Sequence, residues 1–184
     1  AFTNLFESNI ARMDPEKVRQ IIEEGILHLK FCAELYEIQM SEGRFFLHEH
    51  PLHAKSWAVP EIMKIRMMPN IRVVRGDMCR FDMKLEDELG VGLVLKPTGW
   101  MSNSELILKE LNLICTNNNP KEENTAKHRH VHLINGRAKR AQVYPEKLCL
   151  AILKGLRAEL LRSKTMYVGE IGTICEDAIE KEFR

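Results

Sequence analysis

The sequence lacks an excess of charge of either sign. Its 184 residues include 27 lysines and arginines against 26 aspartates and glutamates, a formal net charge of +1. Such a chain has no global field that attracts nucleic acid or an anionic membrane, so any role of that kind needs a local patch. Hydrophobic and charged residues make up 45% and 29% of the chain, fractions typical of a globular protein and not of a disordered one.

Long hydrophobic runs are also missing. The apolar stretches are far shorter than the roughly 20 residues that a membrane-spanning helix needs. The first residues contain Asn4, Glu7 and Asn9 in place of the basic start and apolar run of a signal peptide. The five cysteines are an odd number without disulfide-framework spacing, which favours free thiols in a reducing compartment. We therefore expect an intracellular protein, in the cytoplasm or nucleus, with no membrane partner.

Helical and extended patterns alternate along the chain. Asp14-Pro15 marks a helix start, and an apolar stripe then recurs every three or four residues up to a glycine cap at Gly43. The apolar run 44–47 predicts a buried central strand, and the β-branched run 71–74 predicts another. We further expect helices over 59–68, 102–114 and 145–161, a loop over 82–88, a hairpin or edge strand over 91–100, and a strand over 130–134.

These spacings favour an α/β fold, Rossmann-like and doubly wound, with a mainly parallel sheet and flanking helices. The chain begins at Ala1 without a methionine, in sequence that looks ordered. We therefore expect residues 1–162 to form the back half of a larger domain, so that the Rossmann-like fold is partial, and residues 163–184 to form a tail or linker.

Polar side chains follow the predicted strand over 44–47. In a parallel sheet, ligands gather at the carboxyl ends of the strands. Glu49, between His48 and His50, could act there as a general acid or hydrogen-bond a base edge, with the imidazoles tuning its charge. The structural alternative is that these side chains only satisfy backbone groups where the strand ends.

Possible zinc ligands occur later in the chain. Cys115, His128, His130 and His132 offer donors at short spacing, which can complete a tetrahedral site. Their spacing matches no standard zinc finger, and the stretch is strongly basic, so we predict that these four residues do not share a metal ion. Cys79 is interpreted as a small buried hydrophobe and not as an activated thiol.

The segment 127–140 is basic and contains no acid. Its cations are Lys127, Arg129, Arg137, Lys139 and Arg140. They could contact the phosphates of DNA or RNA, since such contacts need only clustered cations. A solvated surface is the other interpretation. The chain contains no P-loop, no G-x-G-x-x-G and no G-x-S-x-G, so the usual fingerprints of nucleotide binding and of serine hydrolases are absent.

Three segments occur in a familiar order. They are Gly43 to Pro51 with Ser56-Trp57, then Asp77 to Phe81, then Lys96 to Ser104. The order continues through Cys115, His130 to His132, Gly136-Arg137, Tyr144-Pro145 and Leu148-Cys149. Over most of residues 1–160 the chain resembles a domain of retrotransposon-type Pol polyproteins, which in turn is similar to the cytosine-C5 DNA methyltransferases and their phage relatives.

The resemblance implies roles for particular residues. In the methyltransferases a glutamate in a Glu-Asn segment contacts and protonates the target cytosine, and Glu49 matches that place, with His50 where asparagine is usual. The Lys-Pro-Thr element would bring Lys96 and Thr98 to the nucleic acid. The family's nucleophilic cysteine and its glycine-rich cofactor strand would both lie before Ala1.

A methyltransferase needs both a thiolate and bound S-adenosylmethionine. The resemblance therefore implies that S-adenosylmethionine and DNA are ligands of a parent protein, with the upstream half of the polyprotein as a partner. It also implies that this chain alone is inactive and does not bind the cofactor. Two other functions stay open: a non-catalytic nucleic-acid-binding or structural domain that uses the basic segment, and a small zinc-stabilised α/β module.

Overall fold

The first long helix follows directly from the sequence. The computed structural model describes residues 13–118, 127–134 and 136–167, and its first helix is α2 (Pro15–Ser41). The Asp14 side chain accepts a hydrogen bond from the backbone N–H of Lys17 at 3.1 Å, and Gly43 has φ +69° just past the helix end. Both are the usual ways of satisfying the free backbone groups of helix ends, and the predicted start and end are confirmed.

The main sheet has three strands, β1 (Leu47–Pro51), β2 (Arg72–Asp77) and β5 (Pro97–Ser102), in the order β1-β5-β2. Both outer strands pair with β5 in an antiparallel sense, so that Trp100 lies opposite Glu49 on one side and Val74 on the other. The mixed α/β class is confirmed, but the prediction of a doubly wound, mainly parallel sheet is wrong. The reason is that β5 inserts between β1 and β2 and separates two strands that would otherwise run side by side in parallel.

The predicted strand over 44–47 is also wrong in its position. The strand begins at Leu47, and β1 lies at one edge of the described sheet instead of its centre. The preceding residues are held by a side chain and not by a strand ladder: Asn103 accepts from the backbone N–H of Phe46 at 3.0 Å and donates to the carbonyl of Arg44 at 2.9 Å. Glu49 therefore lies in the middle of β1 and not beyond its end.

A second small sheet contains β3 (Lys84–Asp87), β4 (Gly90–Val94) and β6 (His130–Val131), in the order β3-β4-β6. β3 and β4 form an antiparallel hairpin, and β6 pairs with β4 in parallel. The predicted loop over 82–88 is wrong, because Leu85 packs against the core while Lys84 and Glu86 on either side are exposed. The hairpin or edge strand predicted over 91–100 is wrong too, since β4 and β5 belong to different sheets and each is the middle strand of its own sheet. The predicted strand over 130–134 is confined to two residues.

The remaining helices agree more closely with the sequence. α3 is Pro60–Arg66, α4 is Glu105–Leu111, α5 is Arg137–Arg140 and α6 is Glu146–Tyr167, with short 3-10 turns η2 (Lys55–Ala58), η3 (Met78–Phe81) and η4 (Thr116–Asn118). The helix predicted over 102–114 is shorter: its N-cap is Ser104, whose hydroxyl accepts from the N–H of Ile107, and it ends at Leu111. α6 continues past residue 163, where the tail was predicted to begin, and residues 168–184 lie outside the described residues.

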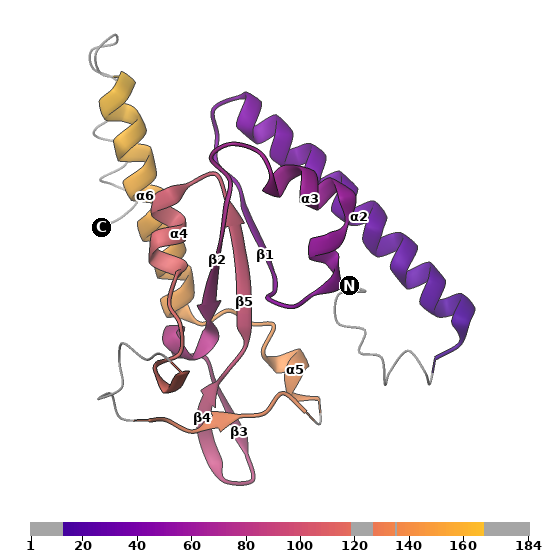
Figure 1. Cartoon of the computed structure of the whole chain (residues 1–184). Helices are drawn as coiled ribbons and strands as arrows, with labels where there is room; N and C mark the ends of the chain where they lie inside the picture. The colour runs from indigo at the N-terminus through magenta and orange to yellow at the C-terminus, as the bar shows by residue number, and fades with distance from the viewer. Residues whose placement is uncertain (1–12, 119–126, 135, 168–184) are drawn as a thin grey trace.

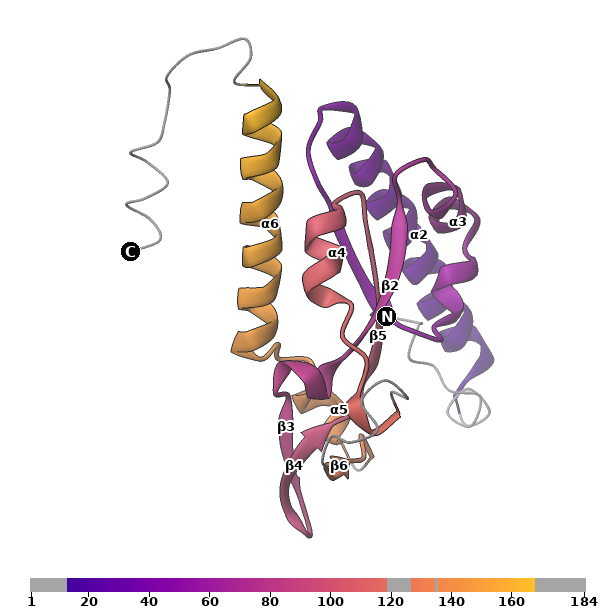
Figure 2. The same cartoon turned by 60° about the vertical axis from the view of Figure 1, so that its left-hand side comes forward.

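Helices cover both faces of the main sheet. α2 and α3 lie on one face, and α4 and α6 lie on the other (Figures 1 and 2). The first core contains Leu29, Ala33, Phe46, Trp57, Ile62, Ile65, Ile71 and Met101. The second contains Met78, Phe81, Val94, Trp100, Ile107, Leu108, Leu111 and Leu148. Among the helices that the structure describes, none combines the length and apolarity that crossing a membrane requires.

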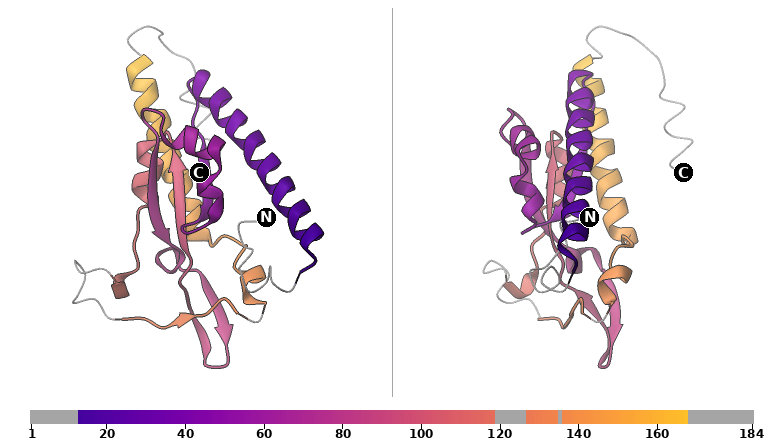
Figure 3. Two further views of the ribbon diagram at one scale, coloured as in Figure 1. Left: turned by 45° about the vertical axis from the view of Figure 1, so that its right-hand side comes forward. Right: turned by 90° about the vertical axis from the view of Figure 1, so that its right-hand side faces the viewer.

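The β3–β4 hairpin projects beyond the end of the main sheet, with β6 beside it (Figures 1 and 3). Between the two sheets lie η3, which follows β2, and the segment that follows α4. This junction brings together side chains that are distant in sequence.

Candidate metal centre

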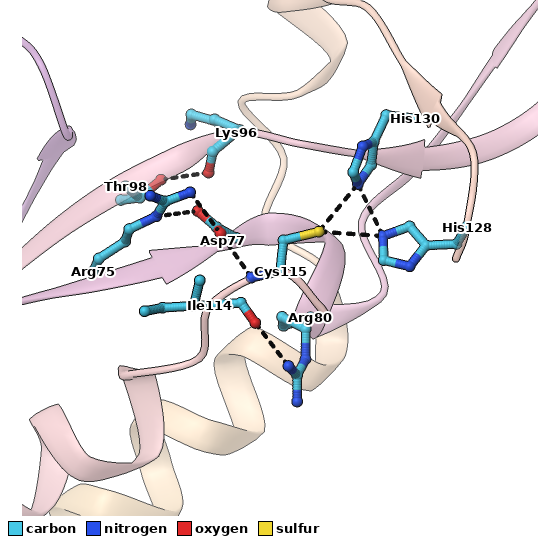
Figure 4. A network of polar contacts seen from close by, with 9 residues as sticks. All are labelled: Arg75, Asp77, Arg80, Lys96, Thr98, Ile114, Cys115, His128 and His130. Atoms are coloured by element: carbon cyan, nitrogen blue, oxygen red, sulfur yellow. Dashed lines mark hydrogen bonds and ion pairs between the residues drawn. The ribbon is translucent and has the colours of Figure 1, made fainter. Parts of the chain in front are cut away.

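Four side chains from three separate segments converge at the junction of the two sheets. Cys79 lies in η3 directly after β2, Cys115 follows α4, and His128 and His130 lie just before and at the start of β6. Their four possible ligand atoms all lie within 4.8 Å of one another. We call these four residues the Cys/His cluster, and Figure 4 shows three of them, Cys115, His128 and His130, facing one another.

The spacing of three of the donor atoms, those of Cys115, His128 and His130, is close to that of a tetrahedral metal site. The sulfur of Cys115 lies 3.6 Å from Nε2 of His128 and 3.5 Å from Nε2 of His130. Zinc bonds of about 2.3 Å to sulfur and about 2.0 Å to nitrogen give tetrahedral edges of roughly 3.3 to 3.8 Å. The two imidazole nitrogens are 2.8 Å apart, so a bound ion would move them apart by about half an ångström. That adjustment is within reach of two side-chain rotations.

Burial controls the protonation of the cluster. Cys79 is 5% exposed and Cys115 is fully buried. Burial, and next the neighbouring Cys115, raise the pKa of Cys79 to about 12. Burial, and next the neighbouring His128, lower the pKa of His130. Neutral imidazole is the form that binds a metal, and a metal is the partner that allows buried thiols to ionise. Burial therefore favours the neutral thiol at Cys79 and the neutral imidazole at His130.

Asp77 fixes the segment that carries Cys115. Its fully buried carboxylate accepts a hydrogen bond from the backbone N–H of Cys115 at 2.7 Å. The same carboxylate accepts two hydrogen bonds from the guanidinium of Arg75, both at 2.9 Å, and this pairing raises the pKa of Arg75 (Figure 4). Arg80 makes a further hydrogen bond to this segment by donating to the carbonyl of Ile114 at 2.7 Å.

The histidine segment is fixed from both sides. The side chain of Asn117 donates to the carbonyl of His128 at 2.7 Å and accepts from its N–H at 3.0 Å. Arg129, between His128 and His130, donates to the carboxylate of Asp87 at 2.7 and 2.9 Å. A Cβ added at Gly92 would lie 2.8 Å from that guanidinium, so the arginine crosses β4 where glycine leaves room. The histidines therefore reach the cluster from an anchored strand.

The predicted donor set is partly changed. The structure brings three of the predicted residues together, but His132 is exposed and lies outside the cluster, because β6 ends at Val131. Cys79 takes the fourth place, and its predicted burial is confirmed. The prediction that Cys115, His128, His130 and His132 share no ion stays a prediction.

Glu49, the predicted catalytic residue, lies away from the cluster. Its carboxylate is 3.7 Å from the ammonium group of Lys96. Burial, and next the charge of the Glu49 carboxylate, raise the pKa of the Tyr144 phenol. Glu49 and Lys96 thus form a half-buried ion pair, and the pKa of Tyr144, which is exposed, responds to the Glu49 carboxylate.

The residues predicted to bind nucleic acid have different surroundings. Thr98 is fully buried and its hydroxyl donates to the carbonyl of Lys96 at 3.1 Å. Arg129 is engaged by Asp87, and Arg137 lies 2.7 Å from Glu88. Lys139 and Arg140 are exposed on α5. The structure does not gather these six residues on one surface patch.

Sequence reasoning missed the roles of Asp77 and Cys79. Both belong to the segment Asp77 to Phe81, in which only Cys79 is interpreted from the sequence, as a small buried hydrophobe. A search of protein-family models, of curated proteins and of solved structures finds no match to this chain, so the assignment of a function rests on the geometry of the chain itself.

Proposed function

We propose that this chain is a zinc-binding module in which a structural zinc ion, held by the Cys/His cluster, fastens the second sheet to the main sheet. The observation that carries the proposal is the convergence of four donor atoms within 4.8 Å of one another. The donors come from η3, from the segment after α4 and from the start of β6, which are separate in sequence.

The chemistry of the donors favours zinc. Two sulfurs and two imidazole nitrogens in a tetrahedral arrangement are a typical zinc set, whereas magnesium and calcium require oxygen ligands. Four protein ligands leave no position for water or substrate, which is the arrangement of structural zinc sites and not of catalytic ones. A structural role is therefore the better interpretation of this site.

A structural ion would act at the shortest strand pairing that the structure describes. β6 consists of two residues, His130 and Val131, and its pairing with β4 covers only those two. An ion bound to His128 and His130 would join this short strand to η3 and to Cys115. Zinc binding of this kind contributes directly to folding free energy, by about 10 to 16 kcal/mol in zinc-finger peptides near neutral pH.

The other functions inferred from sequence have less support. No contact described above favours S-adenosylmethionine, and the expectation that this chain does not bind it stays a prediction, as does the methyltransferase resemblance. The case for a nucleic-acid-binding surface is weakened because Thr98 is buried and because Arg129 and Arg137 pair with acidic side chains of the chain itself. Lys139 and Arg140 remain as exposed cations for such a role.

The test is a measurement of metal in the chain purified under reducing conditions. We expect a single zinc ion per chain and, after replacement with cobalt, the intense visible spectrum of a tetrahedral site with thiolate ligands. Cys115→Ser and His130→Ala should lose the metal and the cobalt spectrum. His132→Ala is the matched control, because it removes a neighbouring exposed histidine and should retain both.

Two results would contradict the proposal. One is a chain that folds equally well in a strong chelator and retains no zinc. The other is loss of zinc in His132→Ala with retention in Cys115→Ser, which would show that the ion sits on a different set of residues.

A further inference from the structure

Asp77 lies behind the Cys/His cluster and is connected to both segments that carry a thiol. We propose that Asp77 is the positioning residue that places Cys79 and Cys115 for the metal ion. The inference rests on the zinc site proposed above. It concerns a residue that does not itself touch the ion.

The carboxylate of Asp77 is held in one orientation. It is fully buried, and Arg75 donates to each of its oxygens at 2.9 Å. The oxygen Oδ2 also accepts the backbone N–H of Cys115 at 2.7 Å. A buried carboxylate clamped by a guanidinium cannot rotate freely, so the third hydrogen bond fixes the backbone of Cys115 at a definite place.

The backbone of Asp77 fixes the other thiol. Its N–H donates to the carbonyl of Leu113 at 2.9 Å, and the next N–H, of Met78, donates to the carbonyl of Lys96 at 3.3 Å. Cys79 follows immediately in η3. One residue therefore joins the end of β2 to the segment that carries Cys115, both through its backbone and through its side chain. Their relative placement sets the distance between the two sulfurs.

The charges indicate a positioning role and not a fifth ligand. Zinc with two thiolates and two neutral imidazoles carries no net charge, and the Asp77–Arg75 pair is neutral as well. Both carboxylate oxygens already accept hydrogen bonds, which leaves the carboxylate committed to Arg75 and Cys115. Residues that orient metal ligands in this way typically change affinity by about 10- to 100-fold when they are replaced.

The experiment compares Asp77→Asn with Arg75→Ala and with a control at a distant buried carboxylate. Glu159 is that control, since it accepts from the hydroxyl of Ser104 at 2.7 Å, at the contact between α4 and α6. Zinc affinity is measured by competition with a chromogenic chelator, and the cobalt spectrum reports the ligand geometry. Urea unfolding is measured for each variant with zinc and with excess chelator.

We expect Asp77→Asn to bind zinc about 10- to 100-fold more weakly and to shift the cobalt spectrum. Arg75→Ala keeps the carboxylate of Asp77 but removes the guanidinium that orients it. We expect this variant to weaken zinc binding too, by a smaller factor than Asp77→Asn does. Glu159→Gln should lower stability equally with and without zinc and leave the zinc affinity unchanged.

The inference would be overturned if Asp77→Asn kept the zinc affinity of the wild type and lost equal stability in zinc and in chelator. Asp77 would then stabilise the fold without positioning the metal ligands. If Asp77→Asn does not fold, unchanged affinity in Arg75→Ala has the same meaning. A wild-type chain that binds no zinc would instead overturn the proposed function itself, and this inference with it.

Discussion

Lowering the pH from about 7 to about 5 should destabilise the fold through His48. This side chain is 5% exposed, and its Nδ1 lies 2.8 Å from the hydroxyl of Tyr36. The ring of His50 is adjacent, with ring centroids 4.5 Å apart. Burial, followed by the charges of His50 and His28, lowers the pKa of His48 to about 3.

The sign of the effect follows from the difference between the folded and unfolded chains. The pKa of an unfolded histidine is about 6.5, whereas the pKa of His48 in the fold is about 3. Between these values the unfolded chain binds a proton that the folded chain does not, so the free energy of unfolding falls as the pH falls. Above about pH 6.5 the contribution is constant. At about pH 5 the loss from this residue is about 2 kcal/mol, which corresponds to roughly 4 to 8 °C in Tm for a chain of this size.

The assay is urea unfolding at both pH values in excess chelator, so that loss of metal does not contribute. His48→Gln removes the titrating ring and should lose about 2 kcal/mol less than the wild type over this pH interval. His132→Gln, which removes an exposed histidine, is the control and should keep the pH dependence of the wild type. Equal losses in the wild type and in His48→Gln would refute the argument, because another group would then be responsible.

Three further substitutions test the packing and the polar contacts. A Cβ on Gly155 would lie 2.6 Å from Cα of Ile107, so Gly155→Ala should lower the free energy of unfolding by about 1 to 3 kcal/mol. This loss should exceed the gain of about 1 kcal/mol that alanine normally gives over glycine in a helix interior. A rise in Tm would contradict the prediction. Glu159→Ala should cost about 1 to 3 kcal/mol in urea unfolding because it leaves the buried hydroxyl of Ser104 without its acceptor; a change within experimental error would show that this hydrogen bond adds nothing. Glu49→Gln should lower the pKa of Tyr144, since the carboxylate raises it, and ultraviolet titration of the phenol measures the change; an unchanged titration would mean that burial alone sets it.

The helices could be predicted from the sequence because their signals are local. Asp14-Pro15 and Gly43 mark the two ends of α2, and Pro60 opens α3, within a residue of the predicted start. Caps and apolar stripes act between residues three or four positions apart, so the signal and the structure share the same stretch of chain. No tertiary contact is needed to recognise them.

The sheets could not be predicted in the same way, because the pairing of strands is decided by contacts between distant segments. Nothing local to β5 indicates that it inserts between β1 and β2. Its place depends on Gly99 and Trp57, since a Cβ on Gly99 would lie 2.7 Å from the indole. Little in the sequence indicates β3, because three of its four residues are charged and Leu85 is its single apolar side chain. An alternating pattern over four residues is too short to separate a strand from a charged loop.

The candidate metal centre shows where reasoning from sequence can be extended. A single cysteine at the end of a strand is compatible with an apolar core, so Cys79 alone carried no signal of a ligand. Asp77, two residues earlier at the end of the same strand, is different, because a buried carboxylate requires specific partners. In the fold those partners are Arg75 and the backbone of Cys115, which is how η3 comes to lie against the segment that carries the second thiol. An aspartate and a cysteine that both follow an apolar run should therefore be interpreted together, as parts of one candidate metal site. The remaining donors of such a site are then to be sought in a histidine-rich segment, which in this chain is the one that supplies His128 and His130.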